Sequence, residues 1–289
     1  MPKPEVPGYE LLDPIGTGAS SVIFKAVEES TQDVVAVKYV ESTSKDNAKV
    51  FRHLEHEHET VSMLQRSSNG SPVVARFTRA RRMLRSRKLL NRRRFRALVM
   101  DYVPGQDLRK ERRYPLGQLL DIYVQVLETI GYLHSRGVVH ADVKPENLIV
   151  NTEGLVTLID FGLSCAIGSK AESIRGTREY MAPEQVELGC LDGRTDLYNT
   201  AASFYYLLTD RQVATMMPNA NGGEYFIGSR TLDTPPLSEL NPHVPPRVAR
   251  AIMQCLASDP ERRPASATEA LNAVRPVVAA FCHQRDIAS

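Results

Sequence analysis

Glycine, serine and lysine residues near the start of the chain have a spacing that suits binding of nucleotide phosphates. The run Gly16-Thr17-Gly18-Ala19-Ser20-Ser21 lies between two segments rich in β-branched residues. Glycines there would let backbone amides approach phosphate oxygens closely, although a hairpin tip is the simpler interpretation. A dinucleotide-binding fold would need a helix next, whereas strand-like VIFKAV follows. Lys38 stands in an apolar stretch twenty residues after Gly18, where it could face solvent or bind phosphate.

A lysine that binds phosphates from within an apolar strand needs a carboxylate to hold it. The helix predicted over Ala48–Gln65 offers three glutamates: Glu55, Glu57 and Glu59. We favour Glu57 because Val61 and Leu64, four and seven residues later, share its face and can pack inward. Glu59 is the second candidate.

The densest group of chemically capable residues lies in the middle of the chain. The run from Val138 to Val150 reads VVHADVKPENLIV and contains Asp142, Lys144 and Asn147. Asp160-Phe161-Gly162 begins thirteen residues after Asn147, and Ala182-Pro183-Glu184 comes later.

This ordered set resembles the protein kinases of the Ser/Thr type, and GTREYMAPEQ resembles their bacterial branch. The resemblance extends from about Tyr9 to about Phe281. It implies an α+β, bilobal fold, with a small β-rich N-lobe that carries one main helix and a larger α-helical C-lobe. We expect a tail over 1–8, the N-lobe over 9–103, the C-lobe over 104–281 and a second tail over 282–289.

The resemblance implies transfer of the γ-phosphate of ATP to Ser or Thr hydroxyls of a protein substrate. This chemistry depends mainly on positioning and on neutralising charge. Asp142 would accept or orient the hydroxyl proton, and Lys144 would offset charge on the γ-phosphate. Asn147 and Asp160 would bind Mg²⁺, or Mn²⁺ in its place. Lys38 and Glu57 would orient the α- and β-phosphates.

Further residues take family roles by position. The adenine would lie among Ile15, Ile23, Ala36 and Ile149, and the hinge that reads it would be Asp101, Tyr102 and Val103, preceded by Met100. The scaffold and substrate platform would comprise His140 and Phe161 (packed with Val61), Gly162, Thr177 (bonded to Asp142 and Lys144), Asp196 (bonded to the catalytic-loop backbone) and the ion pair of Glu184 with Arg263.

Two positions depart from the family pattern. Ser21 replaces the third loop glycine, and Ala141 stands where the family usually has an arginine that pairs with a phosphate on the activation segment. We therefore expect a kinase that does not depend on activation-loop phosphorylation, or one that a partner regulates. The alternative is a catalytically weak or dead, nucleotide-binding, kinase-like scaffold that acts through its arginine-rich segment.

That segment, Arg76–Arg96, holds 11 basic residues and no acidic ones. The other residues carry 25 basic and 34 acidic side chains, so the net charge of +2 conceals an acidic body. Strands are predicted at Val73–Phe77 and Ala97–Val103, which makes the segment an insertion between them. It could be a solvated loop, or it could contact an acidic protein or a nucleic acid.

The 289 residues suffice for a large core without disulfides. Four dispersed cysteines and the lack of a long apolar run favour a cytoplasmic protein without a membrane span. The oligomeric state is not indicated.

Overall fold

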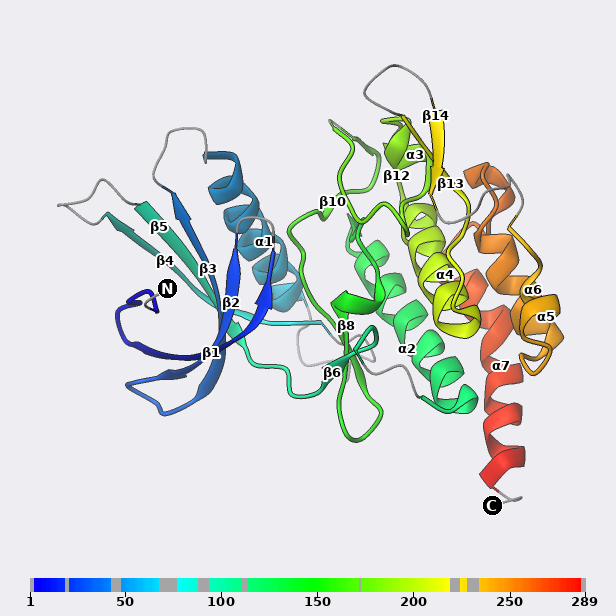
Figure 1. Ribbon diagram of the computed structural model, residues 1–289, viewed down its shortest axis with the longest axis horizontal. Coiled ribbons are helices and arrows are strands. Elements are labelled where there is room, and N and C mark those ends of the chain that lie inside the picture. Colours follow the sequence, from blue (N-terminus) through cyan, green and yellow to red (C-terminus); the bar gives the residue numbers. More distant parts are fainter. Residues whose placement is uncertain are drawn as a thin grey trace. The chain divides into compact units, whose positions relative to one another are not determined.

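The computed structural model describes residues 3–18, 21–42, 48–67, 77–87, 94–110, 114–171, 173–218, 224–227 and 234–286 (Figure 1). The chain divides into two compact units. The first contains Met1–Ser71, Thr78–Pro104 and the short segment Asp160–Gly162. The second contains Pro72–Phe77, Gly105–Ile159 and Leu163–Ser289.

An antiparallel five-stranded sheet forms the first unit, in the order β1-β2-β3-β5-β4. Its strands are β1 (Tyr9–Thr17), β2 (Val22–Glu28), β3 (Val34–Ser42), β4 (Ala80–Arg87) and β5 (Arg94–Asp101). The helix α1 (Ala48–Ser67) places Phe51 and Leu54 in one cluster with Ala36, Val40 and Leu98 of the sheet. Because side chains alternate along a strand, Lys38 lies on the same face of β3 as Ala36 and Val40.

The predicted position of the fourth strand was wrong. β4 spans Ala80–Arg87 and forms a hairpin with β5, so most of the basic segment is sheet rather than an insertion. Residues 73–76 and 88–93 lie outside the described residues, and Phe77 lies in an isolated bridge with Leu158 rather than in a strand. β4 is an edge strand, where arginines can reach solvent while Met83 and Leu84 pack against the core. The density of basic residues hid this strand from the sequence analysis.

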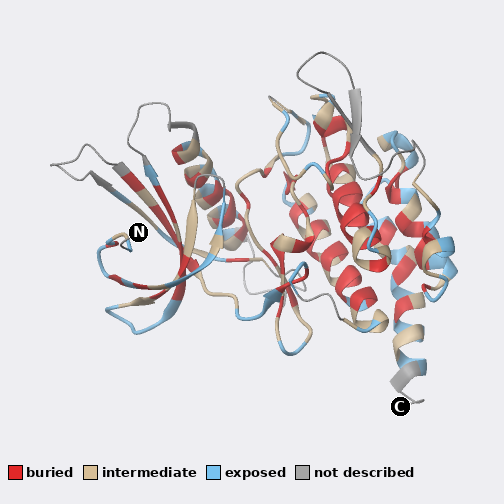
Figure 2. Cartoon of the chain, viewed as in Figure 1, coloured by how far each residue is buried: buried red, intermediate tan, exposed pale blue. Residues whose placement is uncertain are grey.

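Helices dominate the second unit. The longer ones are α2 (Leu116–Ser135), α4 (Gly193–Thr209), α6 (Pro246–Cys255) and α7 (Ala267–Asp286), and the short ones are α3 (Pro183–Val186) and α5 (Leu237–Leu240). Twelve of the seventeen residues of α4 are buried, which makes α4 the central helix of this unit (Figure 2). α7 continues past Pro276 and packs beside α2.

Short strands connect these helices. β8 (Leu148–Val150) pairs with β6 (Gln106–Asp107) and β9 (Val156–Leu158), and β7 (Val138–Val139) pairs with β10 (Cys165–Ala166). The other pairs are β11 (Ser169–Lys170) with β12 (Cys190–Leu191) and β13 (Thr215–Pro218) with β14 (Glu224–Ile227). The 3₁₀ turns η2 (Pro145–Asn147) and η3 (Pro260–Arg262) complete the unit. Over the described ranges, no helix combines the length and apolarity that crossing a bilayer requires.

Candidate active site

A largely buried ammonium group in the first unit is shared by two carboxylates. Lys38 Nζ donates to Glu57 Oε2 and to Asp160 Oδ1, both at 2.8 Å. The side chain of Glu57 is 1% exposed, whereas Glu59 is exposed and Glu55 binds Arg96. Of the three competing glutamates, the structure therefore places Glu57 on Lys38, because α1 turns that position toward β3.

The electrostatics of this cluster follow from one cation facing two anions. Burial lowers the pKa of Lys38, but the charges of Glu57 and Asp160 more than offset burial and raise that pKa above its usual value. Burial also raises the pKa of Glu57, an effect that Lys38 opposes and Asp160 reinforces. The cluster carries one net negative charge when all three groups are ionised, so it would attract a further cation.

Asp160 is presented by a tight turn. Its φ is +63°, in the left-handed region, and Gly162 N donates to its Oδ1 at 3.3 Å. A Cβ at Gly162 would lie 3.2 Å from the same oxygen, which explains the glycine. The side chain of Asp160 is still 38% exposed. A partly exposed carboxylate in a cluster of net negative charge is a suitable ligand for Mg²⁺.

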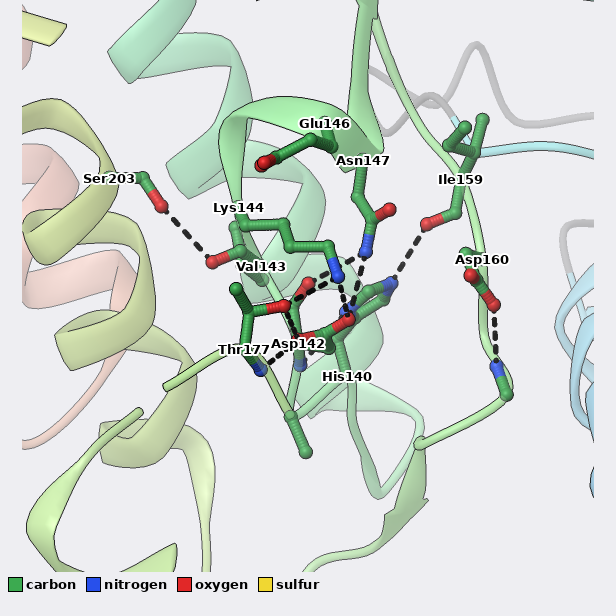
Figure 3. A network of polar contacts seen from close by, with 12 residues as sticks. His140, Asp142, Val143, Lys144, Glu146, Asn147, Ile159, Asp160, Thr177 and Ser203 are labelled. Atoms are coloured by element: carbon green, nitrogen blue, oxygen red, sulfur yellow. Dashed lines mark hydrogen bonds and ion pairs between the residues drawn. The ribbon is translucent and has the colours of Figure 1, made fainter. Parts of the chain in front are cut away.

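The loop after β7 in the second unit converges on the carboxylate of Asp142 (Figure 3). Lys144 Nζ donates to Asp142 Oδ2 at 2.7 Å and to Thr177 Oγ1 at 2.6 Å. The backbone N and the hydroxyl of Thr177 lie 3.1 and 3.2 Å from Asp142 Oδ1. Asp142, Lys144 and Thr177 therefore form one closed network, in which Lys144 balances the charge of Asp142.

Asn147 is oriented by the same loop. Its Nδ2 donates to Asp142 O at 2.9 Å and lies 3.3 Å from Asp142 Oδ2. Figure 3 shows the amide oxygen on the opposite side, turned away from Asp142. An amide oxygen is a hard donor of the kind that Mg²⁺ accepts, so Asn147 also suits a metal ligand.

A buried carboxylate of α4 holds the start of the loop. Asp196, with no exposed side-chain surface, accepts from His140 N at 2.8 Å and from Ala141 N at 2.7 Å. His134 Nε2 lies 2.9 Å from the same carboxylate. The φ of Ala141 is +63°, so these bonds help to stabilise a backbone conformation that L-residues rarely adopt.

His140 is buried and polar in its contacts. Asp142 N donates to His140 Nδ1 at 3.3 Å, which leaves the proton on Nε2, and Nε2 donates to Ile159 O at 3.2 Å. The expected packing partners, Val61 and Phe161, are buried in the first unit, whereas His140 belongs to the second.

Three further polar residues hold the loop, and the sequence analysis missed them. Gln185 Nε2 donates to Ala141 O at 2.8 Å, and Ser203 Oγ donates to Val143 O at 3.1 Å. Asn199 Nδ2 binds Gln185 Oε1 at 2.8 Å. A signal was available, because Asp196, Asn199 and Ser203 recur at three- and four-residue spacing on one face of α4.

The ion pair of Glu184 with Arg263 is buried and bidentate. Arg263 NH1 and NH2 bind the two carboxylate oxygens at 2.7 and 2.9 Å, and Thr195 Oγ1 donates to Glu184 Oε1. Additional bonds to carbonyl groups satisfy the guanidinium. This pair therefore joins α3 to the segment before α7.

The residues predicted to bind the nucleotide base lie in several different elements. Ile23, Ala36 and Met100 share one core cluster of the first unit, and Ile15, at the end of β1, is 40% exposed. Asp101 ends β5 and is followed by Tyr102 and Val103. Ile149 lies in β8 of the second unit.

The glycine-rich loop is described only at its two ends. Gly16 and Thr17 end β1, and Gly18 N donates to Ser21 O at 2.8 Å. Ala19 and Ser20 lie outside the described residues.

The comparisons with known proteins agree with this arrangement. The sequence matches the protein kinase domain family over residues 9–274. It is 30% identical over 273 residues to the serine/threonine-protein kinase pkn3 of Myxococcus xanthus, covering 88% of this chain and 47% of that protein. It is 27% identical over 299 residues to the probable serine/threonine-protein kinase PknB of Bifidobacterium longum, covering 97% and 42%. It is 25% identical over 279 residues to PknB of Mycobacterium leprae, covering 90% and 41%.

The chain therefore belongs to the protein kinase family, whose members use ATP, and its relatives are Ser/Thr kinases. It spans less than half the length of these three relatives.

Proposed function

We propose that this chain transfers the γ-phosphate of Mg-ATP to Ser or Thr hydroxyls of protein substrates. The observation that carries the proposal is the carboxylate of Asp142, which Lys144, Asn147 and Thr177 hold in one network. A carboxylate fixed in this way can orient a hydroxyl and receive its proton.

Residues of both units have a role in the proposed reaction. Lys38, kept charged by Glu57 and Asp160, binds the α- and β-phosphates of ATP. Lys144 lies 2.7 Å from Asp142 and offsets negative charge on the phosphoryl group in transfer. Asn147 and Asp160 would hold Mg²⁺, or Mn²⁺ in its place, which supplies charge neutralisation of the phosphates.

The adenine base of ATP would pack against apolar side chains of the first unit. Ile23, Ala36 and Met100 already cluster there, and Ile15 adds an exposed apolar side chain. The backbone of Asp101–Val103 would hydrogen-bond the adenine edge, and Ile149 would supply an apolar contact from β8. The amides of residues 16–21 would bind the phosphates, with Ser21 in place of a glycine.

We further propose that activity does not require phosphorylation of the activation segment. Ala141 offers no cation to a phosphate, and its backbone is already fixed by Asp196 and Gln185. Thr177, a residue of that segment, is engaged with Asp142 and Lys144 instead. These contacts order the loop around Asp142 without a phosphate group. Equal activity before and after treatment with a phosphatase is the expected result, and a large loss would contradict it.

For the basic segment we propose contact with an acidic protein through Arg79, which is exposed. Arg81, Arg85 and Arg96 bind carboxylates of the same unit, so less charge is available than the sequence suggested. Nucleic acid is the second candidate. Binding of an acidic peptide or an oligonucleotide that weakens with salt and in Arg79→Ser would support the respective partner.

The test of the proposed activity uses γ-labelled ATP, Mg²⁺ and a generic basic protein as acceptor. We expect label transfer by the natural sequence, a loss of about 10³-fold or more in Asp142→Asn, and no change in Asp121→Asn. Asp121 is an exposed acid of α2 bonded only to Gln125 among the described contacts, which makes it a matched control.

A second measurement separates an enzyme from a scaffold. Both variants and the natural sequence are heated with and without Mg-ATP. A shift in Tm without any transfer would favour the kinase-like scaffold, whereas neither shift nor transfer would contradict nucleotide binding as well.

A further inference from the structure

A bulge in the edge strand β4 gives Arg81 an unusual direction. Ala80 pairs with Met100 and Arg82 pairs with Val99, which are adjacent in β5. Arg81 is therefore an extra residue in β4 that has no pairing partner in β5. A bulge of this kind re-aims a side chain that would otherwise follow the alternation of the strand. β4 has a neighbour on one side only, so no further strand restricts where Arg81 points.

Arg81 points at three carboxylates from three parts of the first unit. Its Nε lies 2.5 Å from Asp101 Oδ1, at the end of β5. Its NH1 lies 2.8 Å from Asp33 Oδ2, in the turn before β3, and 3.6 Å from Glu28 Oε2, at the end of β2. The hydrogen bond from Arg81 holds the pKa of Asp33 below its usual value. A network of several charges is worth more than an isolated surface pair.

The segment that Arg81 reaches is held by other contacts as well. Asp101 N donates to the carbonyl oxygen of Arg79, two residues before Arg81, at 2.9 Å. Lys25 Nζ lies 4.9 Å from the ring centroid of Tyr102, the next residue. Lys25 of β2 and Arg81 of β4 thus hold the side chains of Tyr102 and Asp101. The backbone of these two residues is proposed above to hydrogen-bond adenine.

We propose that Arg81 is a positioning residue for the nucleotide base. It contacts no reacting atom, and it acts by holding Asp101, so that the backbone groups of the hinge keep the orientation that adenine requires. This inference rests on the proposed function. Preorganisation lowers the entropic cost of binding, so its loss weakens affinity for the base without altering phosphoryl transfer.

The test compares Arg81→Met, Arg81→Lys and Arg82→Met. Arg82 is the neighbouring arginine in regular register, so Arg82→Met removes the same charge from the same strand. We expect Arg81→Met to raise KM for ATP about 3- to 10-fold while kcat stays within about 2-fold. Arg81→Lys should recover part of the affinity, and Arg82→Met should match the natural sequence. Binding of inorganic tripolyphosphate, which has no base, should be unchanged in all three variants.

A double-mutant cycle identifies the residue through which Arg81 acts. If Arg81 works through Asp101, Arg81→Met should have little further effect on KM in the Asp101→Asn background. Four results would each overturn this inference and leave the proposed function standing. They are an unchanged KM for ATP in Arg81→Met, a fall in kcat as large as the rise in KM, weaker binding of tripolyphosphate, and additive effects of Arg81→Met and Asp101→Asn on KM. Failure of the natural sequence to bind ATP would overturn the proposed function, and this inference with it.

Discussion

The two groups of charged residues are built differently. In the first unit, one ammonium of Lys38 serves two carboxylates, and the side chain of Asp160 stays 38% exposed. In the second unit, every oxygen of Asp142 accepts a hydrogen bond, and Asp196, Gln185 and Ser203 hold the loop around it. The first cluster keeps net negative charge that a metal ion can neutralise, whereas the second is ordered before any ligand binds. A ligand should therefore change the stability of the first cluster more than that of the second.

The largest effect is expected from removing the buried charge that orders the second group. Asp196→Asn replaces an acceptor of two backbone amides by a group that can satisfy only one of them. We expect a loss of about 3 kcal/mol in the free energy of unfolding, together with most of the label transfer. Urea denaturation measures the stability loss. Asp121→Asn is the control, and equal stability of the two variants would show that Asp196 does not hold the loop.

Lys38→Met should break the first cluster. Phosphate transfer should fall by about 100-fold or more, because the charge that we propose binds the phosphates of ATP is lost. The loss of stability should depend on pH. Burial keeps the pKa of Glu57 raised, so the folded variant binds a proton that the unfolded chain releases, and its stability falls as pH rises above about 4.5.

In the natural sequence the ammonium of Lys38 opposes that fall. The raised pKa of Lys38 keeps its contribution intact below about pH 10.5 and lets it decline only as pH rises through the folded value. Denaturation of both proteins at pH 5 and pH 8 tests this, with a larger difference expected at pH 8. A difference independent of pH would contradict the coupling of Lys38 to Glu57.

Thr177 offers a finer test of the second group. Thr177→Ala removes the hydroxyl that lies 2.6 Å from Lys144 Nζ and 3.2 Å from Asp142 Oδ1, while Thr177→Ser keeps it. We expect kcat to fall about 10-fold in the alanine variant and to recover in the serine variant. Steady-state kinetics at saturating ATP measure both. Equal loss in both variants would point to the methyl group rather than to the hydrogen bonds.

The smallest effect is expected at Gly162. An added Cβ would lie 3.2 Å from Asp160 Oδ1 and 3.7 Å from Glu57 Oε2, so Gly162→Ala must displace Asp160 slightly. We expect a loss of about 1 kcal/mol and weaker Mg-ATP binding. Gly131→Ala in α2, whose Cβ would meet Ala267 Cβ at an ordinary 3.5 Å, should instead gain about 0.5 to 1 kcal/mol. Thermal denaturation distinguishes the two, and a gain in both would remove the case for a tight turn at Asp160.

Much of the fold was predictable where the signal is local. In α2, for example, the recurrence of Leu120, Val124 and Leu127 at helical spacing is enough to predict a helix. The fourth strand was misplaced because its arginines outweighed Met83 and Leu84. An edge strand satisfies only part of its backbone and keeps one side in solvent, so its composition resembles that of a loop.

The sequence by itself determined which residue types can carry the chemistry and in what order they come. Asp142, Lys144 and Asn147 lie within six residues of one another, and short spacing along a chain nearly fixes proximity. The tertiary structure decided what distant segments do. It selected Glu57 over Glu59, gathered Asp160–Gly162 into the first unit, and set Gln185 and Ser203 against the loop. These contacts join residues 19 to 122 positions apart, and they depend on the phase of a helix and the packing of a core. Periodicity can show which face of a helix is buried, as it did in favouring Glu57, but not what that face is buried against.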